Sequence, residues 1–159
     1  MGQRMQTLDE TIAAAPVFAG LSADQLTLIA GCARNERVSA GALLGREGDP
    51  ANSFYLIRHG SVALELHAPG RDSLLIETLG DGDVVGWSWL FEPYRWQLDA
   101  RATGPCALIE FDGSCLRGKC DRDHELGYDL MRRSAASLLE TLQSTRIQLL
   151  DVYGHARAL

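Results

Sequence analysis

Apolar and polar residues follow a helical period at both ends of the chain and an alternating period in the middle. Residues 7–15 have the composition of a short helix. A second helix is expected after Ser22, because Ser22 and Gln25, three residues later, form a capping-box pattern. This second helix is expected to end between residues 33 and 35, so residues 1–35 are assigned to N-terminal helices.

The alternating pattern begins at Glu36 and predicts short β-strands. Five apolar residues on either side of a glycine turn share one parity: Phe54, Leu56, Val62, Leu64 and Leu66. Pro69 and Gly70 have the chemistry of a hairpin turn, because proline presets one backbone dihedral angle and glycine supplies a positive one. Many short strands with regular turns are typical of a closed or rolled antiparallel sheet, so residues 36–111 predict a mainly β fold with flanking helices.

After Asp112 the period returns to helical, first through Leu116 and then from about residue 121 to residue 153. Along the second stretch, residues recur at alternating steps of four and three: Met131, Ala135, Leu138, Leu142, Thr145, Leu149 and Val152. This heptad stripe is typical of a helix that pairs with another helix, and it predicts a homodimer. Alternatively the stripe packs back onto the sheet, since Leu139 and Leu150 provide a second apolar face. Residues 112–159 are assigned to C-terminal helices of a single domain.

Composition and charge narrow the classes of partner. The chain has a net charge of −6 and no block of Lys and Arg, so its field should repel a phosphate backbone. No apolar run is long enough to span a bilayer, and residues 1–10 lack the apolar segment of a signal peptide. We therefore expect a cytoplasmic protein that contacts neither membrane nor nucleic acid directly.

The cysteines and histidines do not predict a metal site or a catalytic site. The four cysteines, Cys32, Cys106, Cys115 and Cys120, form no CxxC pair and are interpreted as reduced thiols. No cluster of His and Cys has the spacing of zinc ligands. The acidic residues Asp81, Asp83 and Asp99 are typical of turns and strand ends rather than of a general acid/base pair. An enzyme is not expected.

An ordered set of short motifs lies in the β-rich middle of the chain: Glu47-Gly48-Asp49, Tyr55-Leu56-Ile57, Gly60-Ser61-Val62, Leu79-Gly80, Gly82-Asp83 and Gly86. Over about residues 17–154 this set resembles the cyclic nucleotide-binding domain family. The resemblance implies a double-stranded β-helix, a jelly-roll-like β-roll, followed by a long C-terminal dimerisation helix. It also implies a regulatory sensor for a small anionic ligand, cAMP or another cyclic nucleotide, with no required cofactor.

The C-terminal helix looks like that of the bacterial regulators related to the catabolite activator protein. Residues 150–154 resemble the hinge that precedes the winged-helix domain of those regulators. The sequence stops at Leu159, so the resemblance covers only the sensor and dimerisation parts, and direct DNA binding is not expected. A partner protein would then read the position of the helix.

In the family, a short helix after a glycine holds the cyclic phosphate together with an arginine, and a glutamate accepts from the ribose. Gly86-Trp87-Ser88-Trp89 matches this frame, but Trp87 stands at the glutamate position. The Arg-Ser or Arg-Thr pair of the family falls at Trp96-Gln97. Arg95 lies one residue away and is the candidate for the phosphate, provided that the preceding loop re-aims it.

The resemblance thus gives eight candidate ligand-binding residues: Gly86, Trp87, Ser88, Trp89, Arg95, Trp96, Gln97 and Thr141. Thr141 falls in the slot of the dimer helix that reaches the purine, and a polar surface position is its alternative role. Ser88 could donate to a phosphate or cap the short helix. The tryptophans either stack on a flat ligand or fill the pocket themselves, and Trp89 is interpreted mainly as a core residue. The second case gives the competing hypothesis, a degenerate domain that serves as a dimerisation or docking module.

Overall fold

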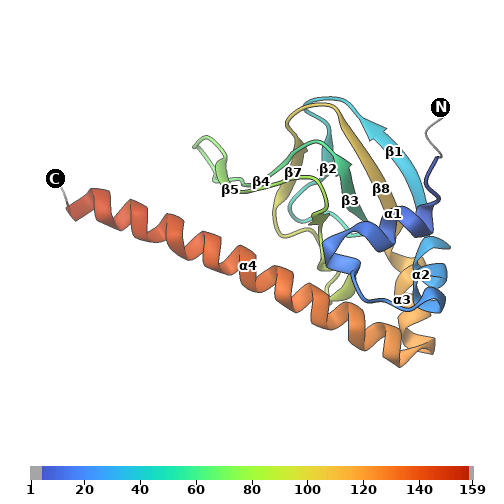
Figure 1. The fold of residues 1–159 in the computed structure, drawn as a ribbon. Helices are drawn as coiled ribbons and strands as arrows, with labels where there is room; N and C mark the ends of the chain where they lie inside the picture. Colours follow the sequence, from blue (N-terminus) through green and yellow to red (C-terminus); the bar gives the residue numbers. More distant parts are fainter. Residues whose placement is uncertain (1–4, 158–159) are drawn as a thin grey trace.

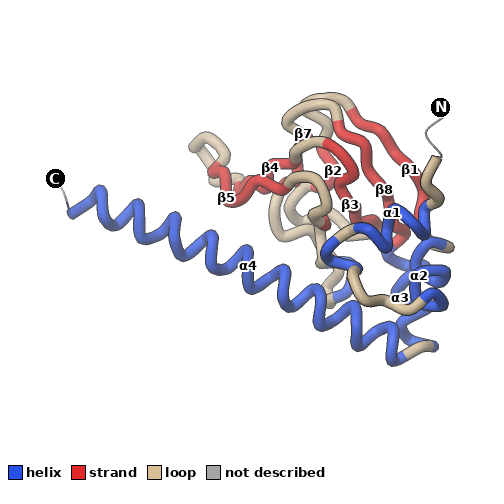
Figure 2. Tube along the Cα trace, viewed as in Figure 1, coloured by secondary structure: helices blue, strands red, loops and turns tan. Residues whose placement is uncertain are grey.

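Residues 5–157 are described by the computed structural model of the chain, which is a β-roll with helices at one end and one long helix along its side (Figure 1). The N-terminal helices α1 (Leu8–Ala14), η1 (Pro16–Phe18) and α2 (Ala23–Ala30) cluster at the end of the roll where α3 (Gly113–Arg122) also lies. Helix α4 (His124–Arg157) starts there and runs past the roll (Figure 2).

Both N-terminal α-helices begin at capping boxes. Thr7 caps α1 with Glu10, and Ser22 caps α2 with Gln25, as the sequence predicts for the second helix. Helix α2 ends at Ala30, earlier than the predicted residues 33–35. The reason is tertiary: the chain from Ala33 onwards already pairs with the last strand of the roll, so it takes extended geometry.

The roll consists of two four-stranded antiparallel sheets. The first has the order β1-β8-β3-β6, with β1 (Ala33–Val38), β8 (Cys106–Asp112), β3 (Ser53–His59) and β6 (Val84–Val85). The second has the order β2-β7-β4-β5, with β2 (Leu43–Gly45), β7 (Asp99–Ala102), β4 (Val62–Leu66) and β5 (Leu74–Leu79). The predicted strands and the β-roll are therefore confirmed.

An aromatic stack fills the core between the roll and the helices. The Phe54 ring lies 4.5 Å from the rings of both Trp89 and Phe111, and nearly parallel to them. Phe18, from the N-terminal turn, packs on Phe111 at 5.9 Å. Trp87 extends the stack toward the long helix, with its ring centroid 6.5 Å from that of Trp89. The stack thereby fixes the segment after Gly86 against the sheet.

Two of the cysteines are joined, which corrects the expectation of four reduced thiols. Cys32, just before β1, and Cys115, in helix α3 (Gly113–Arg122), form a disulfide with their Cα atoms 5.9 Å apart. They are 83 residues apart in sequence, and the pairing of β1 with β8 brings them together. Spacing along the chain gave no sign of this. Cys106 and Cys120 are free and buried.

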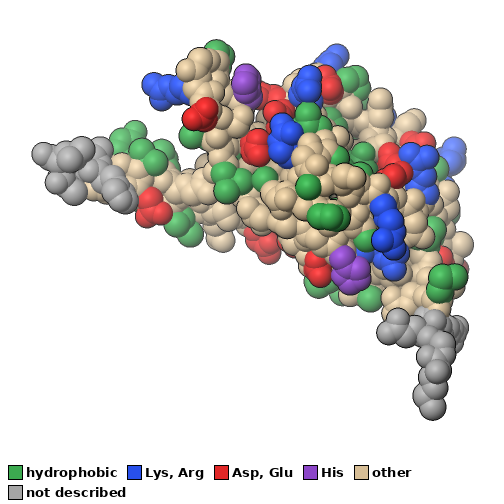
Figure 3. All heavy atoms as spheres, turned by 90° about the horizontal axis from the view of Figure 1, so that it is seen from above, with side chains coloured by type: hydrophobic (Ala, Val, Ile, Leu, Met, Phe, Trp, Pro, Cys, Tyr) green, Lys and Arg blue, Asp and Glu red, His purple; other side chains and the backbone are tan. Residues whose placement is uncertain are grey.

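Helix α4 (His124–Arg157) has its buried side chains only in its first third. Leu126, Leu130 and Ser134 are fully buried, whereas no described side chain of α4 after Ser134 is. All seven residues of the heptad stripe are exposed, so the stripe does not pack back onto the sheet. Figure 3 shows hydrophobic side chains along the projecting end of this helix. The stripe is thus left available to another surface.

Among the described residues, no helix is long and apolar enough to cross a membrane. Within the same part of the chain, no group of three or more His, Cys, Asp or Glu side chains could hold a metal ion.

Candidate functional site

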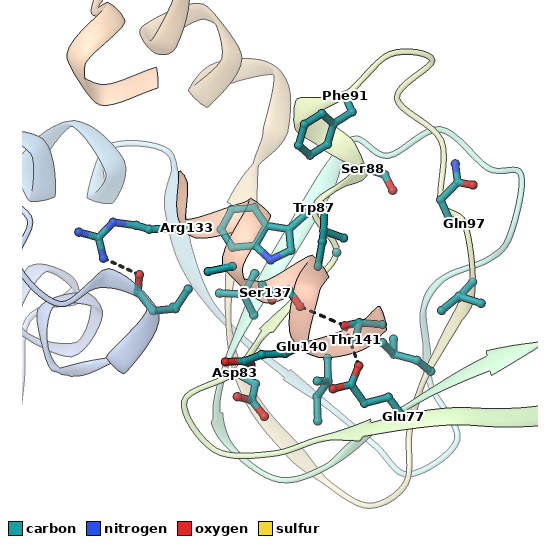
Figure 4. Close-up of a pocket in the computed structure, with 18 of the residues that line it drawn as sticks. Glu77, Asp83, Trp87, Ser88, Phe91, Gln97, Arg133, Ser137, Glu140 and Thr141 are labelled. Carbon is teal, nitrogen blue, oxygen red and sulfur yellow. Dashed lines mark hydrogen bonds between the residues drawn. The ribbon is translucent and has the colours of Figure 1, made fainter. Parts of the chain in front are cut away.

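A pocket of about 800 Å³ lies between the roll and helix α4. Its floor comes from the segment after β6 and from the strands of the second sheet, and α4 and the turn at Pro16 form its other walls. Figure 4 shows side chains from these elements converging on one space. The volume is in the range of pockets that hold a small organic molecule.

Six of the eight predicted site residues line this pocket: Gly86, Trp87, Ser88, Trp96, Gln97 and Thr141. Residues from two distant parts of the chain are therefore brought together where the resemblance expects a ligand. Thr141 comes from α4 and the other five come from the roll. Trp89 and Arg95 are not among the lining residues.

Trp96 occupies the position that the resemblance assigns to the phosphate-binding arginine, and this residue is 7% exposed. The indole lies against two glycines. A Cβ atom on Gly86 would be 2.6 Å from Cη2 of Trp96, and a Cβ atom on Gly45 would overlap the same ring. Gly86 also has a φ of +88°, which L side chains rarely adopt. These glycines therefore make room for an indole.

Trp87 and Trp89 both belong to the core stack, but they differ in their relation to the pocket. Trp89 is 1% exposed and lies between Phe54 and the helices, which agrees with its interpretation as a core residue. Trp87 is 6% exposed and forms part of the pocket wall. Neither indole N–H has a hydrogen-bond partner in the structure. An unpaired buried donor typically costs about 1–3 kcal/mol, which the packing of these indoles must offset.

Arg95 lies away from the pocket. Its Nη1 donates a 2.8 Å hydrogen bond to the Gly48 carbonyl, and its backbone pairs with Pro50 in an isolated bridge. Successive side chains of extended backbone point to opposite sides, so Trp96 faces inward and Arg95 outward. The loop before Arg95 does not re-aim it. The structure therefore gives no support to the expectation that Arg95 reaches a phosphate.

Thr141 contacts strand β5 directly. Its hydroxyl donates a 2.8 Å hydrogen bond to Oε2 of Glu77 on β5, and it lies 3.3 Å from the Ser137 carbonyl of its own helix (Figure 4). Ser88 begins the short helix η2 (Ser88–Leu90), whose N-cap residue Trp87 makes no side-chain capping bond. Ser88 therefore lines the pocket without capping η2.

Sequence reasoning missed the charged residues of the site. Five charged side chains line the pocket: Glu77, Asp83, Glu92, Arg133 and Glu140. One sequence signal could have found Glu77, because it shares strand parity with Leu79, which also lines the pocket, and a carboxylate on an apolar strand face is unusual. No comparable signal marks Arg133, since the direction of its side chain depends on how α4 crosses the roll.

A tight loop positions Asp83 at the edge of the pocket. The Gly80 N–H donates to Oδ2 of Asp83 at 2.9 Å, and Gly82, with a φ of +87°, donates its N–H to the Ile57 carbonyl. In the same loop Asp81 accepts from the Gly60 N–H at 2.9 Å, which, with a weaker contribution from His59, lowers the pKa of its carboxyl. Hydrogen bonds to the ionised form thus favour a rigid acidic turn.

Long-range side-chain hydrogen bonds connect α4 to the N-terminal helices and to β5. Asp129 accepts from Gln25, Arg133 donates to the Val17 carbonyl, Thr141 donates to Glu77, and Gln148 donates to the Ile76 carbonyl. The pocket lies along the stretch of α4 between the second and third of these bonds. Any molecule that fills the pocket therefore touches the helix between its attachment points.

Comparison with known proteins agrees with this fold. The profile of the cyclic nucleotide-binding domain matches residues 35–123. The chain belongs to the cyclic nucleotide-binding domain family. A candidate cyclic nucleotide-binding protein from Geobacter metallireducens has a crystal structure that superposes with a TM-score of 0.77 at 27% identity, covering 86% of this chain and 99% of that one.

Two curated relatives match this cyclic nucleotide-binding domain over most of its length. One is a CRP-like cAMP-activated global transcriptional regulator from Mycobacterium tuberculosis, 26% identical over 84% of the domain. The other is a candidate potassium channel protein from Rhodopseudomonas palustris, 23% identical over 91% of it. The chain spans 60% of the first relative and 34% of the second. Similar sequences therefore occur in a transcriptional regulator and in a candidate potassium channel protein.

Proposed function

We propose that this chain is a regulatory sensor that binds a small molecule in the pocket between the β-roll and α4 and passes the binding event on through α4. The observation that carries this proposal is the pocket itself, which stays open although Trp87 and Trp96 are buried at its wall. A domain that had lost every ligand would gain by collapsing its side chains into that space.

The attachment of α4 supports a transmitting role. Beyond Ser134 no described side chain of α4 is fully buried. The hydrogen bonds of Thr141 and Gln148 link this part of the helix to β5. A hydrogen bond of this kind typically contributes about 0.5–1.5 kcal/mol. A ligand that binds one helix position better than another could therefore shift α4 with a modest difference in affinity.

A cyclic nucleotide is the ligand that family membership suggests, and the Mycobacterium tuberculosis relative is named as cAMP-activated. The pocket geometry gives that ligand little support. Trp96 fills the position of the phosphate-binding arginine, and Arg95 is bonded to Gly48 outside the pocket. Family membership supports a sensor here more strongly than it supports an anionic ligand.

The exposed stripe of α4 supports a homodimer as the working form. Met131, Leu138, Leu142, Leu149 and Val152 are between 41% and 67% exposed, along one line of the helix. Pairing two such helices would bury this stripe and would couple the two pockets through one interface. The dimer helix would then present its state to a partner protein.

A second candidate function is a docking module without a ligand. The burial of Trp87 and Trp96 favours it, since both indoles take space that a ligand could otherwise use. In that case α4 would serve only for dimerisation or partner binding.

A thermal-shift ligand screen, followed by hydrogen-exchange measurements on α4, distinguishes the sensor from the docking module. The full chain would be screened by thermal shift with a small-molecule library that includes cAMP and cGMP, since a ligand that binds only the folded state raises stability with its concentration. The proposal expects a saturable shift and a change in amide exchange over residues 134–148 of α4. A library without any saturable hit, or a hit that leaves exchange in α4 unchanged, would contradict the sensor and favour the docking module.

A further inference from the structure

The pocket is acidic. Four carboxylates line it, from Glu77, Asp83, Glu92 and Glu140. In Figure 4 the carboxylates of Glu77, Asp83 and Glu140 lie at one end of the pocket, away from Ser88 and Phe91. In the part of the chain that the structure describes, none of the four forms an ion pair with a Lys, Arg or His side chain. Their charges are therefore left for a ligand or for solvent.

One cationic side chain lines the pocket, and it is already engaged. Arg133 donates from Nη1 to the Val17 carbonyl at 2.7 Å. Figure 4 shows its side chain running away from Ser137 and Thr141 toward the N-terminal turn. Arg133 therefore offers the pocket mainly its aliphatic stem, and it does not offset the four carboxylates at their end of the pocket.

The remaining walls are aromatic and apolar. Phe91, Trp87 and Trp96 line the same pocket as the carboxylates, together with Leu64, Leu79 and Leu98. An aromatic face attracts a cation through its quadrupole, and indole is the strongest such partner among the side chains. A site that combines carboxylates with indoles favours a positively charged head on an apolar body, whereas it repels a phosphate.

We propose that the ligand of this pocket is a small organic cation, an amine or quaternary ammonium compound with a flat apolar body, rather than a cyclic nucleotide. The carboxylates of Glu77 and Glu140 hold the charged group from opposite walls, β5 and α4. The apolar body packs against the face formed by Trp87 and Trp96. The inference rests on the proposed function, because it takes this pocket as the sensor's ligand site.

The same contacts give the ligand a way to act on α4. Oε2 of Glu77 accepts a hydrogen bond from the Thr141 hydroxyl. An ammonium group that takes this carboxylate competes with Thr141, while Glu140 on the same helix gains a new partner. The attachment of α4 to β5 would thus be exchanged for an attachment through the ligand.

Calorimetric titration with three indoles of similar size and different charge tests the charge preference. The probes are tryptamine (a cation), indole-3-acetamide (neutral) and indole-3-acetate (an anion), with cAMP as a fourth, each titrated into the full chain. Tryptamine is expected to bind at least about tenfold more tightly than the acetate, a difference of about 1.4 kcal/mol. Added salt should weaken tryptamine binding and leave acetamide binding unchanged.

The variant Glu140→Gln removes one pocket carboxylate charge and keeps the size of the side chain, so it tests the contribution of that charge to binding. Glu140 is exposed on α4, so its replacement should not disturb folding. Tryptamine affinity should fall about three- to tenfold while acetamide affinity stays constant. Glu77→Gln should act in the same direction. Glu125→Gln, an exposed change on the same helix outside the pocket, should alter neither affinity.

The possible outcomes distinguish failure of the cation preference from failure of the proposed sensor function. If the acetate or cAMP binds as tightly as tryptamine, or if Glu140→Gln weakens acetamide and tryptamine alike, the cation preference is wrong while a ligand-binding sensor stands. If none of the four probes binds and the library screen also yields no ligand, both the cation preference and the sensor fall.

Discussion

Thr141 on α4 donates a 2.8 Å hydrogen bond to Glu77 on β5, and both residues line the pocket. This bond joins the long helix to the second sheet, next to the Gln148 bond to the same strand. Glu77 is also one of the four pocket carboxylates. In the proposed sensor the attachment of α4 and the binding of a ligand would therefore use the same group, so one side chain would couple binding to helix position.

Replacing Thr141 with valine removes the hydroxyl and keeps the shape of the side chain. We expect Thr141→Val to lower the free energy of unfolding by about 0.5–1.5 kcal/mol and to speed amide exchange in β5 and in α4 beyond residue 141. Thr27→Val is the matched control, since the Thr27 hydroxyl bonds only to a carbonyl of its own helix. Equal exchange rates in α4 for both variants would show that the Thr141 bond does not hold the helix.

The packing of Trp96 against glycine predicts a graded set of alanine variants. In Gly86→Ala the new methyl group would clash with Trp96, and alanine would have to adopt a positive φ. The variant should therefore destabilise the fold by more than about 3 kcal/mol. In Gly45→Ala the methyl group would also clash with the Trp96 indole, but Gly45 does not have a positive φ, so no backbone strain is added. Gly41→Ala has a φ of +86° with open space around it, so it should cost only about 1–2 kcal/mol.

Chemical denaturation of these three glycine variants measures the order. The expected ranking of destabilisation is Gly86→Ala, then Gly45→Ala, then Gly41→Ala. In a Trp96→Ala background, Gly86→Ala should lose the steric part of its cost and keep only the cost of the positive φ. If Gly86→Ala is no more damaging than Gly41→Ala, the indole does not occupy the space above Gly86.

The disulfide predicts a dependence of stability on reductant. Because Cys32 and Cys115 are 83 residues apart, their bond restricts the unfolded chain, and reduction should cost about 2–4 kcal/mol of stability. Thermal unfolding with and without a phosphine reductant measures this. A Cys32→Ser, Cys115→Ser double variant should show a lower melting temperature that no longer responds to reductant.

Thiol titration gives an independent check on the same bond. Denatured protein kept from reductant should release two thiols, from Cys106 and Cys120. In the folded protein Cys120 should react slowly, because burial, followed by Asp121 and Asp123, raises the pKa of its thiol to about 11. Four thiols in denatured, unreduced protein would contradict the disulfide.

The exposed stripe on α4 predicts a dimer, and two charged substitutions within the stripe should dissociate it. Leu142→Glu combined with Leu149→Glu places carboxylates in the seam, and we expect a shift from dimer to monomer in light scattering coupled to size-exclusion chromatography. Gln143→Glu, an exposed change beside the stripe, should leave the dimer intact. A monomeric parent protein would contradict the dimer directly.

Much of the fold could be predicted from the sequence because its determinants are local. The capping box at Ser22, the turn at Gly70 and the shared parity of Phe54 and Leu56 each act within a few residues, and all appear in the structure. The pocket residues from Gly86 to Gln97 could be placed only through the family resemblance. Without it, their pattern gives no more than a short apolar turn.

Apart from Glu77, the charged residues of the pocket could not be predicted, because they meet only through the crossing of distant elements. Glu77 and Thr141 meet only because α4 passes over β5, and Arg133 is turned aside only because the Val17 carbonyl lies within its reach. The disulfide depends in the same way on the pairing of β1 with β8. Such contacts are set by packing geometry, which no local pattern encodes.

The most direct test of the central claim follows the side-chain N–H signals of the three tryptophans by ¹H–¹⁵N NMR while the most tightly bound of the indole probes is added. Trp87 and Trp96 line the pocket, and Trp89 lies in the core outside the pocket lining. The account predicts saturable shifts of the Trp87 and Trp96 signals together with backbone amides of α4 beyond Ser134, and a much smaller shift of Trp89. If the protein is saturated with the probe and the NMR signals of Trp87, Trp96 and α4 do not shift, the result would contradict a ligand-operated pocket.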